Sequence, residues 1–189
     1  MFALGYKYCK VSFPVLEGYL ALARLAETSG DWPRQEAMLR QAAEAGPSQY
    51  RPRITLVQFL LARGQMEAAR EQAAIAMNID TTRVDSYTVL AAAYAWRGQK
   101  NELATLLTAA DRQVPDDLSP RYRAAEVLFS SGRDLDGAQR YFRRYLDAEP
   151  EGNAPAWPET RAKLELVLTK RKEISGTSAL PAPGSAPAR

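Results

Sequence analysis

Four glycines divide this sequence at a constant interval. They are separated by 34 residues in three successive intervals, and they are Gly30, Gly64, Gly98 and Gly132. A constant period of this length is typical of an array of helix–turn–helix repeats, in which each repeat buries its apolar face against its neighbours. The pattern therefore predicts an all-α protein built from stacked helix pairs over residues 16–152.

Each interval carries the apolar periodicity of two helices. Before the glycine, apolar or small residues recur at positions i, i+3, i+4 and i+7, and a second stripe follows after it. In the third interval the second stripe is Leu103, Leu107 and Ala110. In the fourth it is displaced by one residue, which predicts one inserted residue in that turn. Glycine should end each first helix because it adopts a left-handed backbone conformation at the least steric cost.

The repeated unit resembles the tetratricopeptide repeat family. That family has an aromatic, a leucine, a small residue and an aromatic on its first helix, a glycine at the turn, and a proline at the end. In the third interval the matching residues are Tyr87, Leu90, Ala91, Tyr94, Gly98, Ala110 and Pro115. The resemblance implies a right-handed α-solenoid of about four units, at 16–47, 48–81, 82–117 and 118–152. An ordinary helical bundle with coincidentally spaced glycines is the alternative.

The segments that flank the array differ from it. Residues 1–15 would occupy the second-helix half of a repeat whose first half is missing, so they are either a partial repeat or an irregular lead-in. Residues 153–175 form one more amphipathic stretch, which suits a capping helix that covers the last repeat and presents polar side chains to water. Residues 176–189 are rich in proline, alanine, glycine and serine, and we expect them to be disordered.

The composition argues against the commoner kinds of catalysis. The sequence has no histidine and one cysteine, Cys9, so the usual serine and cysteine triads cannot be assembled. It contains neither a glycine-rich phosphate-binding loop nor a paired-cysteine metal motif. We therefore expect a protein that is not an enzyme, with no cofactor, no metal and no small-molecule substrate.

The family resemblance implies that first-helix residues line a concave groove, which would bind a protein or peptide partner. An interaction scaffold of this kind is the favoured interpretation. Leu20 and Ile54 should also lie on the groove-lining face of the first helices. The candidate groove residues are Arg24, Gln58, Leu61, Trp96, Tyr122, Glu126 and Phe129. The apolar and aromatic members would be exposed anchors for an extended or helical peptide. The alternative for Trp96 and Phe129 is packing between neighbouring units.

Two other functions remain open. The chain could be a fragment or subunit of a larger repeat assembly, which packs against further repeats or associates with itself through its N-terminal half-repeat. The arginine-rich fourth unit could bind nucleic acid, although a net charge of +3 and interleaved acidic residues disfavour this. No apolar run approaches the roughly 18–20 residues of a membrane span, and no signal peptide is recognisable, so we expect a cytoplasmic location.

Overall fold

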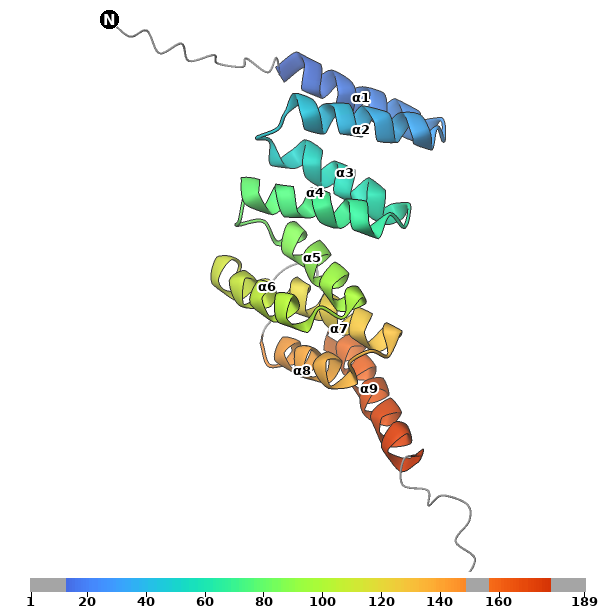
Figure 1. The fold of residues 1–189 in the computed structure, drawn as a ribbon, viewed down its shortest axis with the longest axis vertical. Coiled ribbons are helices and arrows are strands. Elements are labelled where there is room, and N and C mark those ends of the chain that lie inside the picture. Colours follow the sequence, from blue (N-terminus) through green and yellow to red (C-terminus); the bar gives the residue numbers. More distant parts are fainter. Residues whose placement is uncertain (1–12, 149–156, 178–189) are drawn as a thin grey trace, which may run out of the picture. The chain divides into compact units, whose positions relative to one another are not determined.

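The structure, a computed structural model, describes residues 13–148 and 157–177, with side chains for 15–148 and 157–175 (Figure 1). Every regular element in these ranges is an α-helix, which confirms the predicted fold class. The helices are α1 (Phe13–Thr28), α2 (Trp32–Ala45), α3 (Tyr50–Ala62), α4 (Met66–Ile79), α5 (Val84–Arg97), α6 (Lys100–Gln113), α7 (Ser119–Ser131), α8 (Leu135–Leu146) and α9 (Trp157–Thr177). None of these helices is both long and apolar enough to span a bilayer.

The terminal segments lie mostly outside the described residues. The predicted lead-in at 1–15 is described only from Phe13, where α1 begins. The segment predicted to be disordered, 176–189, overlaps the last two residues of α9, and its remainder also falls outside the described ranges.

The chain divides between Leu90 and Ala91 into two compact units. In the first unit α1 packs against α2, α2 against α3, and α3 against α4. In the second unit α7 packs against α8, and α8 also packs against α9. The interior of both units is built largely from leucine, alanine and aromatic side chains of these helices.

The four glycines supply the left-handed residue that ends each first helix. Their φ angles lie between +65° and +73°, a region in which a side chain would strain the backbone. At Gly64 the backbone amide donates to the carbonyl of Leu61 at 3.0 Å, and the amide of Gln65 donates to the carbonyl of Leu60 at 2.8 Å. This pair of bonds is the Schellman arrangement, which satisfies two carbonyls that the helix end would otherwise leave unpaired.

The turn after Gly132 is one residue longer than the other three. The helices α2, α4 and α6 begin two residues after their glycine, whereas α8 begins three residues after it. Asp134 precedes α8 and caps it by accepting a hydrogen bond from the amide of Gly137 at 2.8 Å. The longer turn brings the displaced stripe of the fourth unit inward. Its members are fully buried, and they are Ala138, Phe142 and Tyr145.

Two glycines with open space around them should respond in opposite directions to alanine. A Cβ atom at Gly18 or at Gly64 would meet no heavy atom within 4 Å. Gly64 has a φ of +73°, so Gly64→Ala should lower the free energy of unfolding by about 1–2 kcal/mol. Gly18 lies inside α1, where Gly18→Ala should raise the free energy of unfolding by about 0.5–1 kcal/mol. Urea unfolding followed by circular dichroism measures both, and effects of the same sign would contradict the backbone argument.

Candidate partner-binding surface

The predicted groove residues of the first unit differ in exposure. Arg24 on α1 and Gln58 on α3 are exposed, and Leu61 on α3 is half-buried. These three side chains are therefore accessible to a partner, and their role in binding stays a prediction. The first-helix residues Leu20 and Ile54 are only 4% and 9% exposed, so their predicted place on the groove surface is wrong.

The buried stripe of α1 does not coincide with all the apolar positions of its sequence. In α1 the interior residues include Leu16, Leu20 and Ala23, which follow one another at spacings of four and three. The pattern of apolar or small residues before Gly30 is Tyr19, Leu22, Ala23 and Ala26, but Leu22 is 39% exposed. Several apolar stripes of a helix can satisfy the same periodicity, and sequence spacing alone does not show which of them faces the neighbouring helix.

The predicted exposure of Tyr122 is also wrong. Tyr122 is 4% exposed, and its ring centre lies 5.6 Å from that of Phe142 and 5.3 Å from that of Tyr145. Its hydroxyl donates to a carboxylate oxygen of Glu126 at 3.1 Å and accepts a hydrogen bond from the ammonium of Lys163. Lys163 belongs to α9, so a helix from the capping segment reaches the face on which Tyr122 was expected to be free.

The other groove residues of α7 line an open hollow beside α9. Its volume is about 400 Å³, and Glu126 and Phe129 form part of its wall. The half-buried ring of Phe129 lies 5.5 Å from the ammonium of Lys170, and Leu166 on the opposite side is 57% exposed. We call this depression the α7–α9 hollow. It offers apolar contact surface beside charged side chains.

An ion pair joins α7 to α9 at the edge of this hollow. The ammonium of Lys163 contacts the carboxylate of Glu126 and lies 3.1 Å from that of Glu159. Burial alone would raise the pKa of Glu126, but hydrogen bonds from Lys163, Arg123 and Tyr122 outweigh burial and lower this pKa below its usual value. The pKa of Lys163 is raised, because its bonds to Glu126, Tyr122 and Glu159 outweigh the effect of burial. Lys163 therefore keeps its proton firmly.

The Glu126–Lys163 pair should make stability depend on acid pH. Because the folded-state pKa of Glu126 lies below the usual glutamate pKa of about 4.3, its contribution is present above that pH and is lost as the pH falls through the folded value. Glu126→Gln should therefore lower the free energy of unfolding at neutral pH, and the difference from wild type should shrink as the pH falls below that value. Urea titrations across this pH range test it, with Glu165→Gln on the exposed side of α9 as the control. A difference independent of pH would contradict the assignment.

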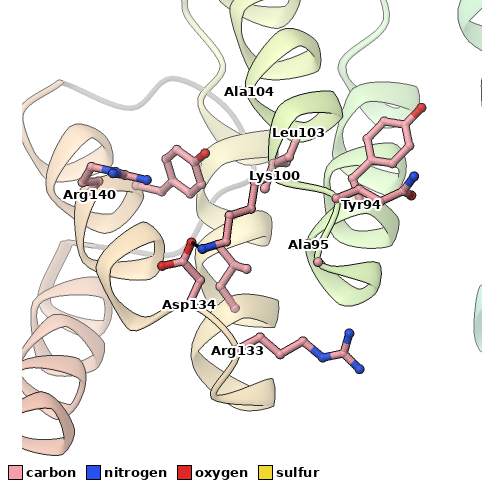
Figure 2. Close-up of a pocket in the computed structure, with 12 residues that line it drawn as sticks. Tyr94, Ala95, Lys100, Leu103, Ala104, Arg133, Asp134 and Arg140 are labelled. Carbon is pink, nitrogen blue, oxygen red and sulfur yellow. Dashed lines mark ion pairs between the residues drawn. The ribbon is translucent and has the colours of Figure 1, made fainter.

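A second concave site lies between the α5–α6 and α7–α8 turns (Figure 2). This cavity, which we call the turn cavity, has a volume of about 270 Å³. Its base includes Leu103 and Leu128, which are 2% and 3% exposed. The charged side chains that line it are Lys100, Arg133, Asp134 and Arg140. It belongs wholly to the second unit.

The charges around the turn cavity are not balanced. The ammonium of Lys100 lies 2.8 Å from Asp134 Oδ2. Burial would raise the pKa of Asp134, but the hydrogen bonds from Lys100 and from the Gly137 amide lower it, so the carboxylate stays ionised. The guanidinium carbon of Arg133 lies 5.7 Å from the ring centre of Trp96, which is 50% exposed. Arg133 thus connects the cavity to the exposed indole.

Arg133 and Arg140 belong to the arginine-rich fourth unit. The arginine-rich patch of the fourth unit was a candidate nucleic-acid surface, but Arg121 pairs with Asp111 and Arg123 with Glu126. The patch is therefore less positive than the sequence suggests. The sequence feature that could have indicated the cavity is the inserted residue of the fourth turn, because this longer turn carries Arg133 and Asp134.

Comparison with known proteins identifies the fold. No protein-family model matches the chain, and no curated protein matches it either. Among solved structures, MamA matches with a TM-score of 0.59 at 15% identity over 90% of this chain and 98% of that one. A MamA segment from Desulfovibrio magneticus RS-1, residues 41 to the end, matches at 0.61 with 12% identity over 86% and 89%. YrrB, described as a TPR protein with an unusual peptide-binding site, matches at 0.58 with 15% identity over 83% and 74%. At these identities the similarity shows the fold, which is a tetratricopeptide-like helical repeat.

Proposed function

We propose that this chain is a non-catalytic scaffold whose helical repeats bind a protein or peptide partner. The observation that carries the proposal is Trp96, whose indole is 50% exposed at the end of α5, in contact range of Arg133. A large aromatic side chain on a rigid helix offers contact area at a low entropic cost, and tryptophan and arginine are enriched among residues that dominate binding energy. The similarity to a repeat protein described as having a peptide-binding site supports the same interpretation.

Other predicted groove residues are also accessible, and each unit has some of them. Those that the structure leaves exposed or half-buried are Arg24, Gln58, Leu61, Glu126 and Phe129.

A capture experiment with two tryptophan variants tests the proposal. Trp32 is a matched control, since it is 41% exposed and lies 5.3 Å from the guanidinium carbon of Arg63. A partner should be retained by the wild-type chain and by Trp32→Ala, and should be lost by Trp96→Ala with an unchanged circular dichroism spectrum. Equal retention by all three proteins would reject Trp96 as an anchor.

Assembly with further repeats or with a second copy is a second candidate function, and α1 favours it. Leu22 and Leu25 on α1 are 39% and 61% exposed, whereas Leu56 and Phe59, which lie 34 residues further on in α3, are 1% and 8% exposed. In the first unit α3 packs against α2. A helix in the equivalent position before α1 would cover its exposed leucines, as the repeat arrangement requires.

Sedimentation velocity tests self-association. If a second copy covers α1, the wild-type chain should sediment faster as its concentration rises. Leu25→Asp should abolish this increase, because it places a charge in an apolar interface. A wild-type sedimentation coefficient that does not change with concentration would reject association through α1.

A further inference from the structure

We propose that the turn cavity binds an acidic peptide segment, with separate carboxylates of the segment meeting Arg133 and Arg140 and a neighbouring apolar side chain inserted into the cavity. This inference rests on the proposed scaffold function and specifies the chemistry of the partner segment. It concerns only the second unit, between the α5–α6 and α7–α8 turns (Figure 2).

The two arginines of the turn cavity have guanidinium groups that are not taken up by ion pairs within the described residues. The ammonium of Lys100 is paired with Asp134 Oδ2 at 2.8 Å, and Asp134 Oδ1 accepts a hydrogen bond from the amide of Gly137 at 2.8 Å. Within residues 13–148 and 157–177, neither Arg133 nor Arg140 forms an ion pair. Arg140 interacts with Asp134 only through space, and the lining holds three cationic side chains against one carboxylate, so the cavity has an excess of positive charge. Guanidinium groups bind carboxylates through strong, charge-assisted hydrogen bonds.

Arg133 is already positioned before any ligand arrives. Its guanidinium carbon lies 5.7 Å from the ring centre of Trp96, and its Nη1 lies 3.9 Å from the point where a Cβ on Gly98 would stand. Interaction with the indole ring restricts the long arginine side chain and leaves other N–H groups of the guanidinium free to donate. Less conformational entropy is then lost on binding.

The cavity suits a side chain of a peptide better than a cofactor. Its volume of about 270 Å³ lies below the roughly 300–1,000 Å³ of typical small-molecule pockets. The base includes the buried side chains of Leu103 and Leu128, and the half-buried rings of Tyr94 and Tyr141 contribute to the wall. An apolar side chain fits this lining, and an adjacent Asp or Glu would meet the arginines.

A peptide titration tests the inference directly. The probe is a fluorescein-labelled hexapeptide of sequence Asp-Glu-Leu-Phe-Glu-Asp with an amidated C-terminus. In the control peptide every Asp is replaced by Asn and every Glu by Gln. The full chain should bind the acidic probe at low salt, measured by fluorescence polarisation. The double variant Arg133→Ala, Arg140→Ala should weaken binding by about tenfold or more, because charge-assisted hydrogen bonds are lost. The amide version should not bind.

A matched control separates this site from general positive charge. Arg143 and Arg144 are exposed on α8, the helix that also carries Arg140. Arg143→Ala, Arg144→Ala removes the same formal charge and should change the affinity by less than about twofold, as expected for exposed charges. Equal losses in the two double variants, or equal binding of the amide peptide, would overturn the proposal.

Competition experiments distinguish other ligands. Displacement of the probe by inorganic phosphate at equal concentration would indicate a site for any anion and would overturn the peptide assignment. Stronger displacement of the probe by an oligothymidine than by an unlabelled acidic peptide would overturn the peptide assignment in favour of nucleic acid. Failure of the acidic probe to bind rejects this inference, but the scaffold function stands if capture of a partner still depends on Trp96. If the acidic probe does not bind and capture of a partner does not depend on Trp96, both proposals are rejected.

Discussion

Leu107→Asp should unfold the second unit or leave it only marginally stable. Leu107 is 1% exposed on α6, between Leu103 and Ala110, which are 2% and 4% exposed. Truncation of a buried leucine to alanine alone costs about 2–5 kcal/mol, and a buried carboxylate without a partner adds to this. The sum is comparable to the roughly 5–15 kcal/mol that stabilises a whole domain.

A thermal melt followed by circular dichroism measures the effect, with Thr108→Asp as the matched control. Thr108 is the next residue on α6 and is exposed, so its substitution should change the free energy of unfolding by about 0.5 kcal/mol or less. The destabilisation by Leu107→Asp should also diminish at acid pH, because the introduced carboxyl is less costly to bury when it is protonated. A melting temperature close to that of wild type would show that α6 presents a different face to the interior.

Tyr122→Ala should lower the free energy of unfolding by about 3–5 kcal/mol, the range observed for buried aromatic residues. The ring of Tyr122 makes an edge-on contact with Phe142 and a tilted contact with Tyr145, and both partners are 0% exposed. Each such aromatic pair contributes about 0.5–1.5 kcal/mol beyond the area it buries. Loss of the ring therefore leaves a cavity and removes two specific contacts.

Tyr122→Phe separates the ring from its hydroxyl. The phenylalanine keeps both aromatic contacts, while Glu126 and Lys163 still pair with each other. We expect a loss of about 1–3 kcal/mol, because the hydroxyl donates one hydrogen bond to Glu126 and accepts another from Lys163. Equilibrium urea unfolding compares the two variants. If Tyr122→Ala instead cost under about 1 kcal/mol and lost partner binding, Tyr122 would be a surface anchor after all.

The exposed aromatic residues show why a candidate site is harder to predict than a fold. Trp96 and Tyr122 both lie on first helices within the same repeat pattern, and the sequence assigns both to one face. Trp96 is 50% exposed, whereas Tyr122 is 4% exposed beneath a hydrogen bond from Lys163 of α9. The difference arises from Phe142 and Tyr145 of α8 and Lys163 of α9, which lie 20 to 41 positions away in sequence and which local periodicity does not record.

The sequence by itself determined the fold class, because the features that specify it are local. A glycine with a positive φ every 34 residues ends a helix wherever it occurs, and the apolar stripes on either side require a neighbour to cover them. Even the longer turn before α8 could be predicted from a stripe displaced by one residue. Only the tertiary structure decided which first-helix residues remain exposed and where a cavity forms. Exposure depends on what packs against a residue, and the turn cavity is built from side chains such as Tyr94 and Tyr141, which the sequence separates by 47 positions and the fold brings to one opening.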